Sequence, residues 1–126
     1  MQAETEVIPS EHESFKWLLE ALCDELVEVH GDPANEDASW IRVVTDSRIV
    51  RAGDVFVALS GERTDGHRYL LQAAESGAFC LVVEHVETGL NVPQLVVENS
   101  RRAYGLIARA WRRRFGIALT AVGGSN

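Results

Sequence analysis

The chain is poor in cysteine, methionine and aromatic residues. Its 126 residues include two cysteines and one methionine, and 7% of them are aromatic. Cys23 and Cys80 lie far apart in apolar surroundings and no CxxC motif occurs, so we expect two buried, reduced thiols. The four histidines are scattered without the spacing of zinc ligands. This distribution predicts that the chain holds no metal ion.

Long hydrophobic runs are absent as well. No apolar stretch approaches the ~20 residues that a membrane helix needs. The N-terminal segment MQAETEVIPSEHE is acidic, unlike the basic and then apolar order of a signal peptide. We therefore expect a cytoplasmic protein with no membrane contact.

Basic residues are outnumbered, and the net charge of −7 argues against nucleic-acid binding. Six of the twelve basic residues fall between Arg101 and Arg114. Their helix can present them as a solvated face or use them to contact an acidic partner. Because the overall field is negative, local geometry has to attract any anionic ligand.

Periodic apolar residues predict helices and strands in alternation. The helices are expected over about residues 12–24, from a cap at Thr64 or Asp65 to Gly77, and from Asn99 or Ser100 to about Phe115. For the first helix, Ser10 and Glu13 can form a capping box, with Ser14 as a competing start. The strands are expected over residues 25–30, 40–45, 54–60, 79–84, 94–97 and 117–122.

This alternation predicts a single α/β domain of three layers, with a mixed, largely parallel sheet of about five strands flanked by helices. The short connection between strands 40–45 and 54–60 favours an antiparallel pair. We expect residues 1–12 to form a flexible extension and residues 13–120 to form the domain.

Two polar clusters lie on either side of strand 54–60. In the first, Arg48 offers a planar fork of donors suited to phosphate, and Ser47 offers a hydroxyl suited to the edge of a nucleobase. Alternatively, Asp46 and Ser47 form a local turn and Arg48 pairs with a carboxylate. Gly53, just before the strand, is free to take a positive φ.

The second cluster is Glu62-Arg63-Thr64-Asp65-Gly66-His67, which leads into a predicted helix. A helix N-terminus can bind an anion through its exposed N–H groups and its dipole. A capped helix start with solvated charges explains the same residues. Neither cluster shows a nucleophile–base pair, so we predict no catalytic residue.

The ordered combination of these motifs resembles the N-terminal domain of the Mur ligases. These ATP-dependent enzymes add amino acids to UDP-N-acetylmuramic acid during peptidoglycan synthesis. The resemblance rests on Thr45-Asp46-Ser47-Arg48, Gly53-Asp54-Val55-Phe56-Val57-Ala58-Leu59, Gly61-Glu62-Arg63 and Asp65-Gly66-His67. A predicted strand that runs into Gly123-Gly124-Ser125-Asn126 is similar to the start of a P-loop.

The resemblance implies roles for individual residues. Those expected to contact the uridine diphosphate (UDP) are Ser47, Arg48, Glu62, Arg63 and Thr64. Those expected to shape the two loops are Asp46, Gly53, Asp65, Gly66 and His67. Gly124, Ser125 and Asn126 would begin the ATP site, with residues 121–126 as the start of a truncated ATP-binding central domain.

Within the family, the chain resembles most the member that adds D-alanyl-D-alanine to UDP-N-acetylmuramoyl-tripeptide. The alternative is the member that adds the third residue to UDP-N-acetylmuramoyl-dipeptide. Either implies ATP and Mg²⁺ as cofactors of the full-length enzyme, which we expect to be a monomer. Its partners would be the UDP-N-acetylmuramoyl-peptide and its own central and C-terminal domains. The fragment alone is expected to bind no cofactor and to be inactive. A non-catalytic α/β interaction module remains a third possibility.

Overall fold

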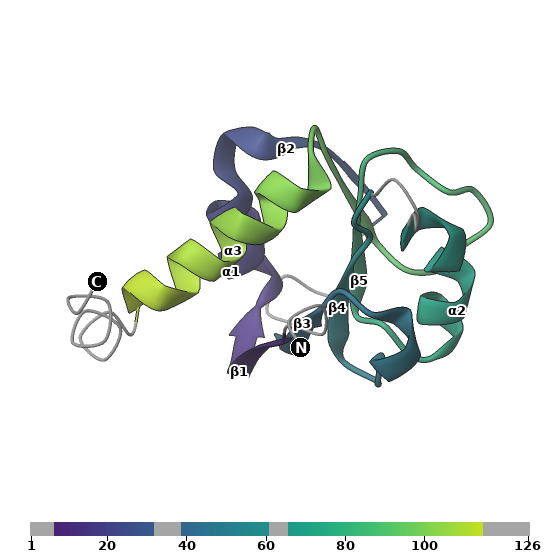
Figure 1. Ribbon diagram of the computed structural model, residues 1–126, viewed down its shortest axis with the longest axis horizontal. Helices are drawn as coiled ribbons and strands as arrows, with labels where there is room; N and C mark the ends of the chain where they lie inside the picture. Colours follow the sequence, from purple (N-terminus) through teal and green to yellow (C-terminus); the bar gives the residue numbers. More distant parts are fainter. Residues whose placement is uncertain (1–6, 32–38, 61–65, 115–126) are drawn as a thin grey trace.

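The computed structural model describes residues 7–31, 39–60 and 66–114. In this part of the chain, six strands form one sheet in the order β1-β3-β4-β5-β6-β2. Figure 1 shows β4 and β5 in the middle of the domain, between α3 and α2. The elements in chain order are β1 (Val7–Ser14), α1 (Phe15–Leu22), the 3₁₀ turn η2 (Cys23–Glu25), β2 (Leu26–His30), β3 (Ser39–Val44), η3 (Ser47–Ile49), β4 (Asp54–Val57), η4 (Gly66–Tyr69), α2 (Leu70–Glu75), β5 (Cys80–Val83), β6 (Gln94–Val97) and α3 (Ser100–Arg114).

The predicted mixed, largely parallel sheet is confirmed. Strands β3 to β6 run parallel to one another, while β1 pairs antiparallel with β3 and β2 pairs antiparallel with β6. All four residues of β4, of β5 and of β6 are buried. Their apolar sequences agree with this burial, because central parallel strands are covered on both faces.

The predicted antiparallel pairing of 40–45 with 54–60 is wrong, because β3 and β4 are parallel. Residues 45–53 carry the chain back along the sheet between them. Nine residues can span roughly 30 Å, which is more than the length of β3. The return ends at Gly53, whose φ of +91° confirms the expected positive-φ turn.

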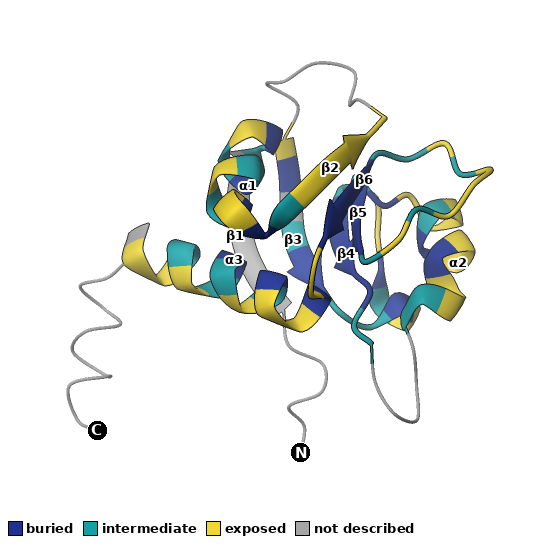
Figure 2. Ribbon diagram, turned by 90° about the horizontal axis from the view of Figure 1, so that it is seen from above, coloured by how far each residue is buried: buried dark blue, intermediate teal, exposed yellow. Residues whose placement is uncertain are grey.

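Helices cover both faces of the sheet, as the three-layer prediction requires. Figure 2 shows α1 and α3 on one side of the sheet and α2 on the other. Alternate strand residues point to opposite faces. One core joins α1 and α3 to residues such as Trp40, Val55 and Val82. The other joins α2 to residues such as Phe56 and Leu81.

The N-terminal prediction needs correction. Residues 7–14 form β1, although residues 7–12 were expected in a flexible extension and 12–14 in a helix. The helix begins at Phe15, where Ser14 accepts a hydrogen bond from the Trp17 N–H at 3.1 Å, so the competing Ser14 start is correct. The apolar spacing that predicted the helix also begins at Phe15. Residues before it pair through their backbone with β3, which apolar periodicity does not detect.

The two cysteines differ in exposure. Both are free, but Cys23 is exposed, so the expected burial holds for Cys80 alone.

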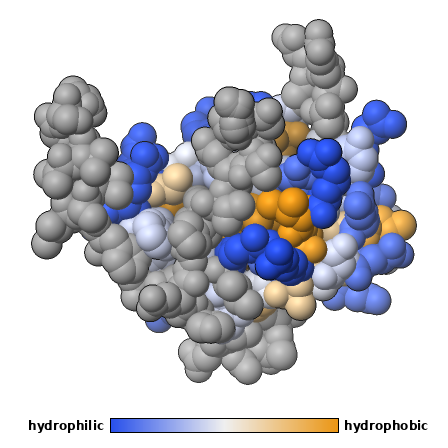
Figure 3. Space-filling model, turned by 60° about the horizontal axis from the view of Figure 1, so that its bottom comes forward, coloured by the Kyte–Doolittle hydropathy of each residue, from blue (hydrophilic) through white to orange (hydrophobic). Residues whose placement is uncertain are grey.

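Hydrophobic residues also reach the surface. Figure 3 shows one face of the domain, where hydrophobic side chains form a patch bordered by hydrophilic ones. Over the described ranges, no helix has the length and apolar character needed to cross a membrane. Large hydrophobic residues exposed in the described chain are Val27, Val29, Tyr69 and Leu71.

Candidate functional site

The first polar cluster forms a tight turn directly after β3. Asp46 caps η3 by accepting the Arg48 N–H at 2.9 Å. The same carboxylate accepts two hydrogen bonds from the Arg48 guanidinium, from Nε at 3.0 Å and from Nη2 at 2.7 Å. These bonds lower the pKa of Asp46 and raise that of Arg48. The alternative of a local turn with a carboxylate-paired arginine therefore describes the unliganded chain.

Arg48 nevertheless remains available to a ligand. Its side chain is 80% exposed, whereas that of Asp46 is 13% exposed. The pair holds the guanidinium in one orientation at the surface, and an exposed pair of this kind contributes little to stability. Ser47 is buried, and its hydroxyl lies 3.5 Å from Gln72 Oε1 on α2, which is long for a hydroxyl hydrogen bond.

A buried ion pair between Arg42 and Asp54 contacts the end of this turn. Asp54 at the start of β4 accepts hydrogen bonds from Arg42 Nε at 3.1 Å and Nη2 at 2.6 Å. Arg42 Nη2 also donates to the Ile49 carbonyl at 2.9 Å, and Asp54 accepts the Arg51 N–H at 2.9 Å. The hydrogen bonds that Arg42 donates to Asp54 raise the pKa of Arg42. These bonds tie β3 and the start of β4 to Ile49 and Arg51 in the return segment.

Of the second cluster, the structure describes Gly66 and His67. Glu62, Arg63, Thr64 and Asp65 lie outside the described residues. Gly66 donates its N–H to the Leu59 carbonyl at 2.8 Å. A Cβ atom at Gly66 would lie 2.9 Å from the Ala58 Cα, so glycine is needed where the chain passes close to β4.

His67 accepts a hydrogen bond from the Glu84 N–H through Nε2 at 2.8 Å. Its ring also stacks on that of His85, with centroids 4.6 Å apart. These two contacts join His67 to the residues that follow β5, and its loop-shaping role stays a prediction.

The predicted helix after this cluster begins later than expected. Residues Gly66–Tyr69 form the 3₁₀ turn η4, and α2 begins at Leu70. Its N-cap is Tyr69, which makes no side-chain capping bond, so the prediction of a cap at Thr64 or Asp65 is wrong. The second cluster therefore does not lead directly onto a helix N-terminus. The buried positions Leu70 and Ala73 supplied the helical spacing, and spacing alone does not separate a 3₁₀ turn from the helix that it precedes.

The two clusters follow strands that end at the same edge of the sheet. Because β3 and β4 are parallel, Thr45 after β3 and Ala58 after β4 leave the sheet on the same side. In open α/β sheets, ligands bind beyond the carboxyl ends of the parallel strands. The described residues place Ser47 and Arg48 at this edge.

Sequence reasoning missed a group of hydrogen bonds at the same edge. Glu84 follows β5, Ser60 lies just beyond β4, and Ser100 begins α3 after β6. Glu84 accepts the Ser60 hydroxyl at 2.8 Å, the Ser100 N–H at 2.8 Å and the Ser100 hydroxyl at 3.1 Å. The available signal was a polar residue just past each of three parallel strands.

The electrostatics of this group favour a charged carboxylate. Burial raises the pKa of Glu84, but the hydrogen bonds from Ser100 and Ser60 outweigh burial and leave the pKa below its usual value. In the ranges that the structure describes, no group of three or more histidine, cysteine, aspartate or glutamate residues could hold a metal ion.

The fold and this polar edge define a three-layer α/β domain of the class that binds ligands at the ends of parallel strands. Residues 42–112 match the family described as "Mur ligase family, catalytic domain". The match covers more than half of the chain, so the chain belongs to the Mur ligase family. The absence of a catalytic residue from this chain stays a prediction.

Individual relatives are similar over most of the chain. The UDP-N-acetylmuramoyl-tripeptide–D-alanyl-D-alanine ligase of Synechocystis sp. is 41% identical over 93 residues, which cover 72% of this chain and 20% of that protein. The UDP-N-acetylmuramoyl-L-alanyl-D-glutamate–2,6-diaminopimelate ligase of Bradyrhizobium diazoefficiens is 40% identical over 95 residues, which cover 75% and 20%. The chain thus spans about a fifth of the length of these curated relatives.

The fold is also similar to a solved structure of a ligase from Acinetobacter baumannii. That protein is the UDP-N-acetylmuramoylalanyl-D-glutamyl-2,6-diaminopimelate–D-alanyl-D-alanyl ligase, and the TM-score is 0.71 at 32% identity. The alignment covers 85% of this chain and 23% of that chain.

Proposed function

We propose that the chain is the UDP-substrate-binding domain of the ligase that adds D-alanyl-D-alanine to UDP-N-acetylmuramoyl-tripeptide. The observation that carries the proposal is the polar edge, where two parallel strands of a Mur ligase chain end in clusters suited to a nucleotide diphosphate. The Synechocystis and Acinetobacter relatives, whose names carry this activity, support the choice within the family.

The site residues proposed are those implied by the family resemblance. The residues in contact with the UDP are Ser47, Arg48, Glu62, Arg63 and Thr64. The residues that shape the loops are Asp46, Gly53, Asp65, Gly66 and His67. Gly53 and Gly66 have support from the positive φ of one and the close approach of the other to β4.

The ligation reaction itself would require the full-length ligase. That ligase would use ATP and Mg²⁺ and would act in the cytoplasm as a monomer. It would contain this domain together with a central and a C-terminal domain. In this scheme the substrate domain includes β1 and ends at about residue 120, and residues 121–126, with Gly124, Ser125 and Asn126, begin the ATP-binding domain. The fragment by itself would bind substrate and catalyse nothing.

A second candidate is the ligase that adds the third residue to the UDP-N-acetylmuramoyl-dipeptide. The 40% identical Bradyrhizobium relative, a diaminopimelate-adding ligase, favours it. Residues of this edge would hold the same uridine diphosphate in either enzyme, so the two candidates differ in the peptide that the substrate carries.

Calorimetry on the 126-residue chain tests the proposal. We expect weak binding of UDP-N-acetylmuramoyl-tripeptide, and adenosine diphosphate serves as the control nucleotide. Preference for the dipeptide substrate would move the assignment to the third-residue ligase. A folded chain that gives no heat with either substrate at millimolar concentration would contradict the proposed site.

A further inference from the structure

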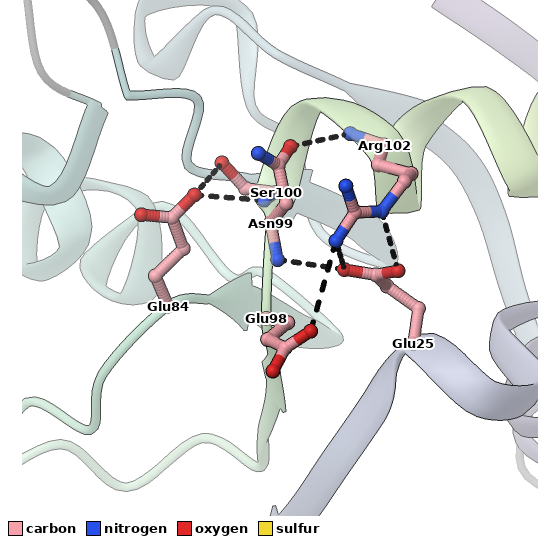
Figure 4. Close-up of polar contacts among 6 residues, drawn as sticks. All are labelled: Glu25, Glu84, Glu98, Asn99, Ser100 and Arg102. Carbon is pink, nitrogen blue, oxygen red and sulfur yellow. Dashed lines mark hydrogen bonds and ion pairs between the residues drawn. The ribbon is translucent and has the colours of Figure 1, made fainter.

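Two carboxylates hold the first turn of α3 from opposite sides (Figure 4). Glu25 accepts the Asn99 N–H at 2.7 Å and two hydrogen bonds from the Arg102 guanidinium, at 2.8 Å and 3.1 Å. Glu84 accepts the N–H and the hydroxyl of Ser100. A carboxylate at a helix N-terminus is stabilised by the helix dipole and by the unpaired N–H groups.

Glu25 and Glu84 differ in the other residues that they contact. Glu25 lies in η2, and its backbone carbonyl accepts the Glu98 N–H at 3.2 Å. Glu84 also accepts the hydroxyl of Ser60, the last described residue before that cluster. Its backbone N–H donates to Nε2 of His67, the last residue of the cluster. Glu84 therefore contacts the chain on both sides of residues 61–65.

Two further hydrogen bonds hold the residues on either side of positions 61–65. Leu59 and Gly66 are joined by a backbone hydrogen bond of 2.8 Å. Arg101 on α3 donates from Nη2 to the Ser60 carbonyl at 3.2 Å. The side chain and the carbonyl of Ser60 are thus held by two different elements, the segment after β5 and the start of α3. These contacts fix where the chain leaves and re-enters the sheet edge.

We infer that Glu84 is a positioning residue for the substrate loop. It joins Ser60 and His67, the described residues on either side of residues 61–65, to the start of α3. The ligand's identity as a UDP-sugar rests on the proposed function. The positioning role itself rests on the hydrogen bonds of Glu84, Ser60, His67 and Ser100, which the substrate-free chain already makes.

The test is hydrogen exchange on the substrate-free chain, comparing Glu84→Ala with Glu25→Ala. Both substitutions remove a carboxylate from the start of α3, but Glu84 alone bonds Ser60. We expect Glu84→Ala to raise the exchange rate of the Gly66 amide by roughly tenfold relative to Glu25→Ala, because opening there no longer has to break the Ser60 bond. Equal exchange at Gly66 in the two variants would overturn the inference.

Two more variants keep the test decisive. Glu84→Gln retains an oxygen for Ser100 and an amide that can donate to the Ser60 hydroxyl, so it should restore most of the protection that Glu84→Ala loses. If Glu84→Ala does not fold, Ser60→Ala removes the loop contact and leaves both Ser100 bonds. Unchanged Gly66 exchange in Ser60→Ala would then overturn the positioning role.

Substrate affinity separates this inference from the proposed function. If the chain binds UDP-N-acetylmuramoyl-tripeptide, Glu84→Ala should weaken binding by roughly tenfold and Glu25→Ala should leave it nearly unchanged. Equal weakening by both would count against positioning. If the wild-type chain binds no UDP-sugar, the proposed function fails, while the exchange comparison still decides the role of Glu84.

Discussion

Arg42 and Asp54 lie opposite each other on neighbouring parallel strands, with Arg42 Nη2 2.6 Å from Asp54 Oδ2. The Asp54 side chain is 1% exposed and that of Arg42 is 22% exposed. Removing one partner from a buried pair leaves the other without compensation. This pair therefore has consequences for stability that the exposed Asp46–Arg48 pair does not share.

We expect Arg42→Ala to lower the free energy of unfolding by roughly 3 kcal/mol, because the Asp54 carboxylate would stay buried with one N–H donor left from Arg51. Urea denaturation followed by circular dichroism measures the change. Arg48→Ala is the matched control and should barely move the midpoint. A similar loss of unfolding free energy in both variants would show that burial does not determine how much each ion pair contributes to stability.

The same control variant should be defective in binding. If Arg48 contacts the diphosphate, Arg48→Ala loses a charge-assisted hydrogen bond, and affinity for UDP-N-acetylmuramoyl-tripeptide should fall roughly tenfold or more. Titration calorimetry on a variant of unchanged stability gives the comparison. An unchanged dissociation constant would remove Arg48 from the proposed site.

Two glycines should respond in opposite directions to alanine. At Gly66 the new Cβ would lie 2.9 Å from the backbone of Ala58 and Leu59, so Gly66→Ala should destabilise the chain by roughly 1–3 kcal/mol. Gly105 lies exposed within α3 with nothing within 4 Å of the added atom. Gly105→Ala should stabilise the chain by about 0.5–1 kcal/mol. Thermal melting tests both signs, and a loss of stability in the helix variant would contradict the prediction.

Acid should destabilise the domain through carboxylates with lowered pKa values, those of Glu84, Glu25 and Asp46. A group with a lower pKa in the folded state stabilises fully above its unfolded value, 4.5 for glutamate and 3.8 for aspartate. That stability is lost as the pH falls through the folded value. Urea midpoints should therefore be level above about pH 5 and decline toward pH 3. Glu84→Gln should show a smaller decline, and an unaltered slope would exclude Glu84 as a contributor.

The two cysteines should differ in reactivity. Cys23 is exposed, whereas Cys80 is fully buried in β5 and burial raises the pKa of its thiol. Because the thiolate is the reactive form, a thiol reagent should label Cys23 in the native chain and Cys80 after unfolding. Mass spectrometry of the labelled peptides identifies the sites. Rapid native labelling of Cys80 would contradict the packing of the sheet.

Much of the fold follows from local patterns in the sequence. The apolar runs of β4, β5 and β6 and the helical spacing from Phe15 mark elements whose side chains face a core. β1 escaped prediction because it is held by backbone pairing with β3, and apolar spacing does not register such pairing. The parallel direction of β3 and β4 was missed for a related reason. Chain length alone does not show that residues 45–53 run back along the sheet.

The candidate site was predicted in part. The motif around Arg48 identified a polar turn, and Gly53 has the positive φ expected of it, whereas the close approach of Gly66 to Ala58 was not predicted. The bonds of Glu84 to Ser60 and Ser100 could not be read from spacing, because they join residues that come together only when β4, β5 and β6 align. Whether Arg48 pairs with Asp46 or with a ligand depends on occupancy, which a sequence does not encode.

The strand order has a consequence for how the chain is made. β1 and β2 both come from the first thirty residues, yet they occupy opposite margins of the sheet. During synthesis Leu26 has to wait for its partner Val97, because β6 is translated about seventy residues later. Until then the growing chain carries a valine-containing strand whose backbone lacks its partner, and an unpaired strand of this kind can pair with another chain.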